Sequence, residues 1–435
     1  MTDYTKLYEE KKMTPEQMAQ FVQSGDKIAS TTAMGEPPKI LDAICDRALA
    51  EDLTDIKLYK LWMVPMGGKY TLPELDGHVD PVSLFAGGSE VRQMIGEGRA
   101  DYIPSYLCQH PHIFRNIKPR IAVAMASPMD ESGYFSFSTA PLEGTTITEV
   151  ADIVLLEVSP HMPRVFGDNM IHISQVTAFC ETDTKPVEVP LTEPGENDIK
   201  IAEKIVERIP DGSCIQFGIG KVPDAVGSLM KDKKDLGIHT ELFCSSMLEL
   251  IKAGAVNNSR KNINKGKSVF TFCGGTRELY DYIDNNPSVE GYQSTYINDP
   301  YIIAQNDNVM SINAALEIDI FGQVCSESIG PKKISGTGGQ LDFVRGANMS
   351  KGGKSFIALH STAKGGTISK IKPILTPGAH VTVPMSEVDM VVTEYGLAEL
   401  KYRTASERAK ALISIAHPSV REELTFEAKK FGLMI

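Results

Sequence analysis

Long apolar runs are missing from this sequence, since no stretch approaches the roughly 18 apolar residues that a membrane-spanning helix requires. The first ten residues also lack the apolar core of a signal peptide. Cysteine is scarce, and its seven copies stand singly, without a Cys-x-x-Cys pair or a regular disulfide framework. These absences predict a soluble, cytoplasmic protein with no membrane partner and with reduced thiols.

Positive charge is also in short supply. Lys and Arg number 44 against 56 Asp and Glu, which leaves a net charge of −12. A general nucleic-acid surface needs clustered Lys and Arg to neutralise phosphates, so no nucleic-acid partner is expected. An anionic ligand would have to be bound locally, by backbone N–H groups, a helix N-terminus or a few placed lysines.

Several standard catalytic motifs are absent. There is no Gly-x-Ser-x-Gly elbow, and both Gly-Lys-Ser segments lack the upstream glycine of a phosphate-binding loop. No His-x-x-x-His or paired-cysteine set suggests a metal, and His110-Pro111-His112 is interpreted as loop packing because a third ligand is not evident. Hydrolase triads, nucleotide kinases and zinc enzymes are therefore disfavoured, and no metal site is assigned.

The length of 435 residues exceeds what one hydrophobic core usually serves, so two domains are expected. Residues 181–197 carry three prolines and many polar residues without helical periodicity, which is typical of a linker. We place the boundary there, with an N-terminal domain at 1–185 and a C-terminal domain at 186–435. Short β-rich runs among helical segments predict an α/β fold with largely parallel, buried sheets.

Both halves show the order helix, strand, glycine-containing turn, helix. In the first half, Thr14-Pro15-Glu16-Gln17 predicts a capped helix to about Val22, and the expected strand is 27–30. In the second half, residues 201–209, 213–217 and 218–223 correspond to the helix, strand and turn. The order fits two similar open α/β domains, although a chance repetition of α/β units explains it equally well.

Three segments of the second half could carry chemistry. The turn Gly218–Pro223 opens a predicted helix, where an anion can bind, or it merely connects strand to helix. Glu241 stands among apolar neighbours in a strand-like run, although an isolated Glu is usually a solvated or salt-bridged side chain. The segment Ser335–Phe343 contains three glycines, which can direct N–H groups inward as an oxyanion nest or form only a tight turn.

Taken together, segments spread over almost 300 residues resemble the family of acetyl-CoA hydrolases and CoA-transferases, in particular its 4-hydroxybutyrate and butyryl-CoA:acetate transferase branch. The resemblance is carried, in chain order, by residues 127–136, 157–164, 218–223, 237–241, 338–343, 393–398 and 415–418. It implies an active site at the interface of two CoA-transferase-like domains.

The resemblance also implies roles for individual residues. Glu241 matches the nucleophilic glutamate of the Gly-Ile-His-Thr-Glu motif, and Asn298 matches a position that contacts coenzyme A (CoA) near its sulfur. Glu394 matches a second acidic position, and Lys364 is expected to meet a phosphate of CoA. The oxyanion donors would be an amide of Ile219 or Gly220 and one of Gly338 or Gly339. The remaining matched positions are expected to bind CoA, and they are Gly218, Ile219, Gly220, Lys221, Val222, Gly338 and Gly339.

One segment departs from the family. Cys244-Ser245-Ser246 follows the glutamate where relatives commonly have Ser-Asp-Gly, so the wall of the acyl pocket is expected to differ. Cys244 could itself be a nucleophile, but no Cys-His arrangement is identifiable, which favours a buried inert thiol.

The implied function is transfer of CoA from a short acyl-CoA, such as 4-hydroxybutyryl-CoA or butyryl-CoA, to a carboxylate such as acetate. CoA would be a substrate and a covalent intermediate, no cofactor would be permanently bound, and a homodimer or homotetramer is typical of such enzymes. Two alternatives are an acyl-CoA hydrolase on the same scaffold and a non-catalytic acyl-CoA sensor.

Overall fold

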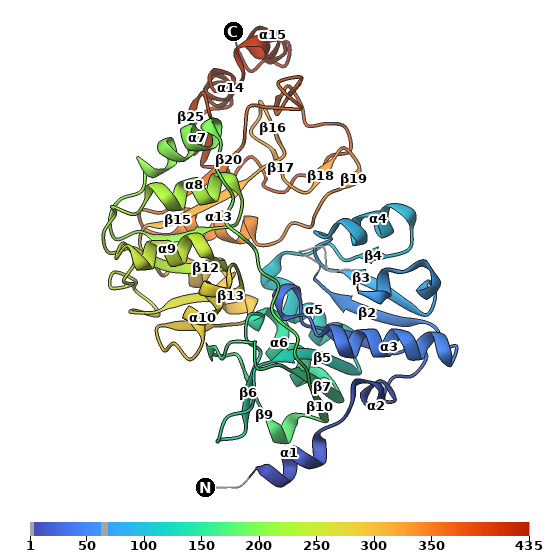
Figure 1. Ribbon diagram of the computed structural model, residues 1–435. Coiled ribbons are helices and arrows are strands. Elements are labelled where there is room, and N and C mark those ends of the chain that lie inside the picture. The colour runs from blue at the N-terminus through green and yellow to red at the C-terminus, as the bar shows by residue number, and fades with distance from the viewer. Residues whose placement is uncertain (1–3, 62–67, 435) are drawn as a thin grey trace. The chain divides into compact units, whose positions relative to one another are not determined.

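The computed structural model describes residues 4–61 and 68–434. These residues form two compact units (Figure 1). Unit 1 comprises Met1–Val189 and Val269–Ile297, and unit 2 comprises Pro190–Ser268 and Asn298–Ile435. The segment Val269–Ile297, which the sequence analysis assigned to the C-terminal domain, thus clusters with unit 1.

Unit 1 is built on a seven-stranded sheet in the order β10-β7-β5-β1-β2-β3-β4, in which every recorded pair is parallel. Its strands are β1 (Lys27–Ser30), β2 (Ile56–Lys60), β3 (Val79–Ser83), β4 (Asp101–Tyr102), β5 (Ile121–Ala126), β7 (Ile153–Val158) and β10 (Ala178–Glu181). Its helices include α1 (Thr5–Lys11), α2 (Pro15–Ala19), α3 (Pro38–Ala50), α4 (Ser89–Glu97), α5 (His110–Ile117), α6 (Pro141–Val150), α10 (Arg277–Ile283) and α11 (Ser294–Ile297).

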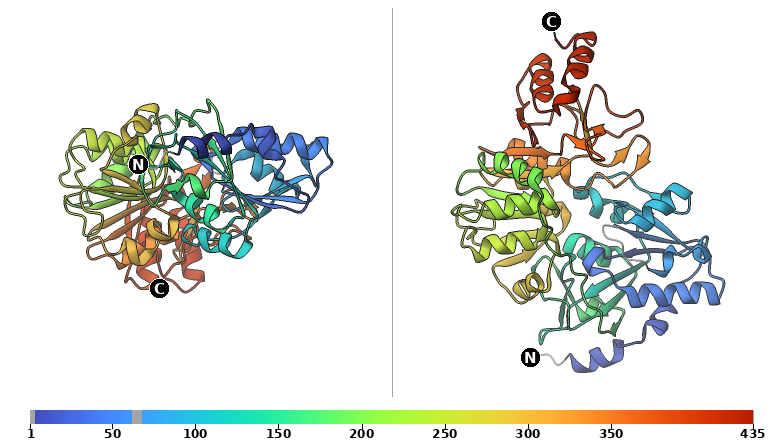
Figure 2. Two further views of the ribbon diagram at one scale, coloured as in Figure 1. Left: turned by 90° about the horizontal axis from the view of Figure 1, so that it is seen from below. Right: turned by 45° about the horizontal axis from the view of Figure 1, so that its top comes forward.

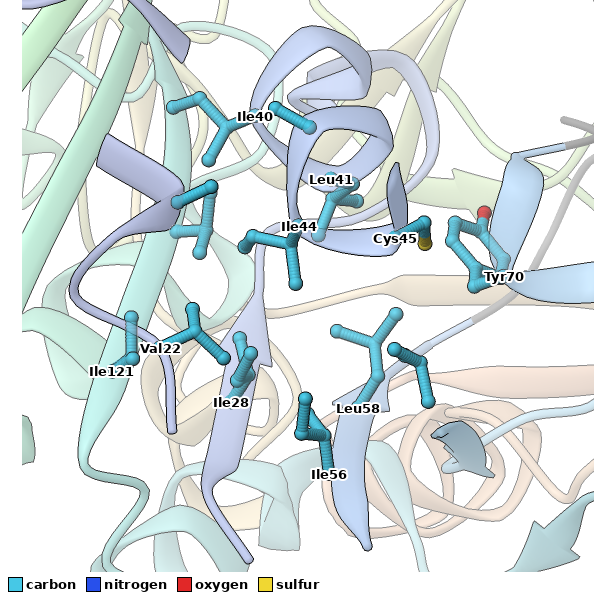
Figure 3. Close-up of a cluster of buried hydrophobic side chains, with 14 of the residues drawn as sticks. Val22, Ile28, Ile40, Leu41, Ile44, Cys45, Ile56, Leu58, Tyr70 and Ile121 are labelled. Atoms are coloured by element: carbon cyan, nitrogen blue, oxygen red, sulfur yellow. The ribbon is translucent and has the colours of Figure 1, made fainter. Parts of the chain in front are cut away.

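One hydrophobic core of unit 1 lies between α3 and the sheet (Figure 3). Apolar residues of α3 recur at helical spacing, and Ile40, Leu41 and Ile44 all point onto the strands. They pack against side chains from β1, β2 and β5, among them Ile28 and Leu58. The spacing therefore explains why this segment is a helix covering a sheet.

Helix α2 begins where the sequence predicts and ends earlier. The Gln17 amide donates to Thr14 Oγ1 at 3.2 Å, as the capping motif requires. The helix was expected to reach Val22 but stops at Ala19. The Arg47 guanidinium donates to the carbonyls of Ala19 and Val22 at 2.7 and 2.6 Å. A side chain distant in the sequence thus binds carbonyl groups at the end of the helix and just after it.

The interpretation of His110-Pro111-His112 as loop packing is wrong, because these residues form the first turn of α5. Proline at the second position suits a helix start, since its missing N–H would have no intrahelical partner there. His110 is fully buried, and burial lowers its pKa to about 3. The described residues contain no cluster of three potential metal ligands.

Unit 1 also buries a group of ionisable side chains around Lys60. The Lys60 ammonium forms an ion pair with Glu36, and the Tyr70 hydroxyl donates to Glu36 Oε1 at 2.5 Å. Glu143, in the first turn of α6, is fully buried, and neither of its carboxyl oxygens has a hydrogen-bond partner among the described residues. Burial raises the pKa of Glu143 to about 8, and the charge of Lys60 opposes this rise.

The wild type is expected to lose stability at alkaline pH because Glu143 ionises there, and Glu143→Gln should prevent this loss. The folded-state pKa of about 8 lies above the ordinary value of 4.5, so ionisation favours the unfolded chain and the free energy of unfolding falls between these values as pH rises. Glutamine stays neutral, and the variant should gain on the order of 3 kcal/mol over the wild type at pH 9 but little at pH 5. Thermal melts at both pH values measure this, and Glu149→Gln on the exposed side of the same helix should change neither.

Unit 2 has a sheet whose strands follow the order β25-β24-β20-β15-β11-β12. Recorded pairs are parallel except β24 with β25. The strands are β11 (Cys214–Phe217), β12 (Gly237–Cys244), β15 (Val309–Ala314), β20 (Lys354–Ala358), β24 (Met390–Thr393) and β25 (Gly396–Glu399). The α/β prediction with largely parallel sheets is thus confirmed for both units.

Helices α7, α8 and α9 lie side by side in unit 2, in green in Figures 1 and 2, whereas α13 contacts β15 and β20. The unit's helices are α7 (Glu196–Val206), α8 (Lys221–Leu229), α9 (Ser245–Lys252), α12 (Pro300–Ile303), α13 (Gln340–Met349), α14 (Ala405–Ser414) and α15 (Arg421–Lys430). Short strands in unit 2 include β16 (Glu317–Asp319), β17 (Val324–Cys325), β18 (Ser328–Ile329), β19 (Lys332–Lys333), β21 (Thr362–Ala363), β22 (Ile368–Ser369) and β23 (Ile371–Lys372). Within residues 4–61 and 68–434, no helix has both the length and the apolar composition that a bilayer crossing demands.

Candidate active site

The turn after β11 brings backbone N–H groups to the carboxyl edge of the unit 2 sheet. Gly218 and Ile219 follow the strand, and Gly220 caps helix α8. Gly220 has φ +119° and ψ 176°, a conformation open essentially only to glycine. The helix start presents the amides of Lys221 and Val222, and an added Cβ on Gly218 or Gly220 would meet no atom within 4 Å. Space for a close ligand therefore exists on this side of the turn.

Glu241 lies on the neighbouring strand β12. The parallel register pairs Cys214 with Gly237 and Ile215 with Ile238, and its continuation sets Glu241 level with Gly218. Every other residue of β12 is buried, whereas Glu241 is partly exposed. A carboxylate at this strand end therefore stands beside the glycine turn, where open α/β sheets collect their ligands.

Two donors hold the Glu241 carboxyl group. Asn298 Nδ2 donates to Glu241 Oε2 at 2.9 Å, and the Gly339 amide donates to the same side chain. Asn298 is fully buried, and its Oδ1 has no hydrogen-bond partner among the described residues. The Glu241 carboxyl group, the Asn298 side-chain amide and the Gly339 backbone amide are thus brought together from segments far apart in the chain.

The backbone of Gly339 lies close against the side chains of Glu241 and Asn298. A Cβ at this position would lie 1.8 Å from Glu241 Oε2 and 2.0 Å from Asn298 Nδ2. Gly339 itself has φ −97°, which any residue adopts, whereas Gly338 has φ +58° in the left-handed region. Gly339 is therefore required for space, and Gly338 for the conformation that leads the chain into α13.

The environment of Glu241 raises its pKa to about 7, first of all because the protein around the carboxyl group removes water from it, although the residue as a whole is partly exposed. The nearby charge of Asp342 raises it further, and the hydrogen bonds from Asn298 and Gly339 act in the opposite direction. Asp342 was quoted within a family segment of the sequence without being given a role. At neutral pH the carboxyl group is divided between its two protonation states.

Glu394 and Lys364 lie further along the same unit. Glu394, in the turn between β24 and β25, accepts hydrogen bonds from the Ser361 amide at 2.9 Å and the Ser361 hydroxyl at 2.5 Å. Lys364 is exposed in the hairpin turn between β21 and β22, and no bond between it and Glu241, Asn298 or Gly339 is recorded. Ser361, which the sequence analysis did not assign, links the ends of β20 and β24.

Cys244 closes β12 and faces the glycine turn. Its thiol lies 3.8 Å from the carbonyl oxygen of Gly218, and Ser246 Oγ donates to Asp224 in the first turn of α8. Burial raises the pKa of Cys244 to about 12, so the side chain is a neutral thiol rather than a thiolate. The segment that departs from the family pattern thus packs against the Gly218–Val222 loop.

Known proteins resemble this chain over nearly its whole length. The family profile of the acetyl-CoA hydrolase/transferase N-terminal domain matches residues 1–190, and that of the C-terminal domain matches residues 275–428. The 4-hydroxybutyrate coenzyme A transferase of Clostridium kluyveri is 42% identical and the match covers 98% of this chain and 99% of that protein. The butyryl-CoA:acetate CoA-transferase of Anaerostipes caccae is 37% identical, with 97% of each covered. The crystal structure of RipA from Yersinia pestis, 38% identical, matches with a TM-score of 0.93 over 100% of both chains.

Proposed function

Because this chain belongs to the acetyl-CoA hydrolase/transferase family, we propose that it is a CoA-transferase that carries CoA on the side chain of Glu241. The donor would be a short acyl-CoA, 4-hydroxybutyryl-CoA or butyryl-CoA, and the acceptor a carboxylate such as acetate. The names of two relatives support these substrates, since they are a 4-hydroxybutyrate coenzyme A transferase and a butyryl-CoA:acetate CoA-transferase.

A single observation supports the relay most directly. The Glu241 carboxyl group is held by Asn298 and by the Gly339 amide at the carboxyl edge of the sheet, level with a second glycine turn. A carboxylate is a weak nucleophile, but it can attack a thioester when the oxyanion is stabilised and water is excluded. A solvated surface glutamate would have neither property.

The first half-reaction has two covalent steps. A Glu241 oxygen attacks the thioester carbonyl carbon, the C–S bond breaks, and CoA leaves as a thiolate while an acyl-glutamyl anhydride forms. The thiolate then attacks the glutamyl carbonyl carbon, the anhydride C–O bond breaks, and the first acid leaves as its carboxylate. Glu241 now holds CoA as a thioester, and an acceptor acid reverses both steps, which gives ping-pong kinetics.

The surrounding residues receive roles in this scheme. The amide of Ile219 or Gly220 and that of Gly338 or Gly339 would stabilise the oxyanions, each donor being worth roughly 3 kcal/mol. The remaining roles follow the family positions. Gly218, Lys221 and Val222 would line the bound CoA, Asn298 would contact it near the sulfur, Lys364 would meet a phosphate, and Glu394 would stay beside the site.

Transfer requires ionised Glu241, so the rate should rise as the pH rises through the pKa of this residue. With the pKa near 7, kcat/KM for acyl-CoA is expected to rise with pH and to level off at about one unit above 7. Asp342→Asn removes a negative charge that raises this pKa, and the midpoint should move down by about half a unit or more. A pH–rate series on wild type, Asp342→Asn and the exposed control Asp232→Asn measures the shift. A profile flat from pH 5 to 9 would contradict an ionising nucleophile.

One experiment distinguishes a transferase from its alternatives. The protein is incubated with butyryl-CoA with and without acetate, and free CoA, acetyl-CoA and butyrate are quantified. A transferase makes acetyl-CoA only with acetate, a hydrolase releases CoA without it, and a sensor does neither. Borohydride reduction of the acyl-CoA-treated protein, followed by peptide mass spectrometry, should locate the modification at Glu241; a modification elsewhere would overturn the relay.

A further inference from the structure

The loop that ends at Gly339 is anchored by a buried charge, Glu327, in the connection between β17 and β18. Glu327 is 5% exposed, and its Oε1 accepts hydrogen bonds from the hydroxyls of Thr382 at 3.0 Å and Thr337 at 3.3 Å. Its Oε2 forms an ion pair with Lys333 at 2.7 Å. A carboxylate is costly to bury without such partners. The two hydroxyl donors and the lysine therefore stabilise Glu327 in its buried position.

The backbone of Glu327 holds the same loop at its start. The amides of Ile334 and Ser335 donate to the Glu327 carbonyl oxygen at 2.8 and 3.1 Å. The loop is thus attached to one residue twice, through the main chain at residues 334 and 335 and through the side chain at Thr337.

The far side of the loop is attached to the sheet. Gln340 Nε2, at the first position of α13, donates to the carbonyl oxygen of Ala314 at the end of β15 at 3.3 Å. Gly338 and Gly339 therefore lie between two fixed points, Thr337 and Gln340. Between these two points, the Gly339 amide lies against Glu241 at the start of α13.

We propose that Glu327 is a positioning residue that, through the Thr337 hydroxyl, fixes the Gly339 amide opposite the Glu241 carboxyl group. It touches neither substrate nor the reacting atoms. The inference rests on the proposed function of Glu241 and adds the residue that sets the geometry of its donor.

A positioning role for Glu327 affects the pKa of Glu241, whereas a purely structural role does not. The hydrogen bond from Gly339 lowers the pKa of Glu241, so a loop that drifts away from the carboxyl group lets that pKa rise. A mutation that merely weakens the fold lowers the melting temperature and leaves the titration of Glu241 in the folded protein unchanged.

Thr337→Val tests this because it removes the hydroxyl and keeps the shape of the side chain. We expect the apparent pKa in kcat/KM to rise by about half a unit or more and kcat to fall about tenfold, with the KM for acyl-CoA nearly unchanged. Thr337→Ser keeps the hydroxyl and should restore both values. Thr382→Val removes the other hydroxyl bonded to the same oxygen, and should lower the melting temperature without moving the pKa. Should the valine variant not fold, Thr337→Ala is measured with the same expectation.

The titration is also followed without turnover, by NMR of the protein labelled with 13C-glutamate at the carboxyl carbon, with the Glu241 signal assigned by its loss in Glu241→Gln. A wild type that titrates near 7 yet transfers no CoA would refute the proposed function and leave the positioning test intact. A Glu241 pKa unchanged in Thr337→Val, or shifted equally by Thr382→Val, would overturn the positioning proposal.

Discussion

Glu241→Gln is expected to abolish CoA transfer while the protein remains folded. The amide keeps the size of the side chain and a hydrogen-bond acceptor for Asn298 and Gly339, but it has no carboxylate oxygen to attack a thioester. Loss of a nucleophile typically costs many orders of magnitude, so kcat should fall by about 10⁴-fold or more. The measurement is acetyl-CoA formation from butyryl-CoA and acetate, together with the thermal melt of the variant.

The matched control for this substitution is Glu394→Gln. Glu394 is also a partly buried glutamate of unit 2, but it is bonded to Ser361 rather than to Asn298 and Gly339. The loss of CoA transfer in Glu394→Gln should be far smaller than the loss in Glu241→Gln. Transfer at near wild-type rate in Glu241→Gln, or an equal loss in both variants, would remove Glu241 from its assigned role.

Gly339→Ala is expected to lower kcat strongly while the protein remains folded. The new Cβ would lie 1.8 Å from Glu241 Oε2 and 2.0 Å from Asn298 Nδ2, so both side chains must move. Both atoms are the ends of side chains and the backbone of Gly339 suits alanine, so the fold should tolerate the change. With the nucleophile displaced and one donor misaligned, kcat is expected to fall about 10²- to 10³-fold.

The control for the added methyl group is Gly96→Ala, inside helix α4, where a Cβ would meet nothing within 4 Å. This variant should be as active as the wild type and slightly more stable, because alanine favours a helix. If Gly339→Ala kept full activity with an unshifted melting temperature, the contact between Gly339 and Glu241 would not exist in solution.

Local sequence patterns correctly predicted the elements that are determined by residues close to one another in the sequence. The strand Lys27–Ser30 and the capping motif at Thr14 were found as expected, because a capped helix start and a short strand after a turn are determined within a few residues. The end of α2 differs from the prediction: residues 20–22 bond to carbonyls three residues back, and Arg47, far along the chain, binds the carbonyls of Ala19 and Val22. The fold class follows from many such patterns, whereas individual element ends follow from tertiary contacts.

The candidate site divides in the same way. Composition and periodicity alone left Glu241 as an ordinary surface charge, and only the resemblance to a family singled it out. Its meeting with Asn298 joins residues 57 positions apart, which no local period can indicate. Asp342 and Thr337 lie in the glycine-containing segment Ser335–Phe343, yet the charge effect of Asp342 on Glu241 and the bond of Thr337 to the buried Glu327 depend on distances that sequence alone does not provide.

The route of the chain constrains how this enzyme can be dissected. Unit 2 is interrupted after Ser268, and the chain resumes it at Asn298, the residue that donates to Glu241. A recombinant fragment cut at the linker would leave unit 1 without Val269–Ile297 and would attach that piece to unit 2 as a foreign insert. Chimeras with related enzymes should therefore exchange Val269–Ile297 together with the N-terminal half, and a graft that moves the junction by one residue would take Asn298 away from Glu241.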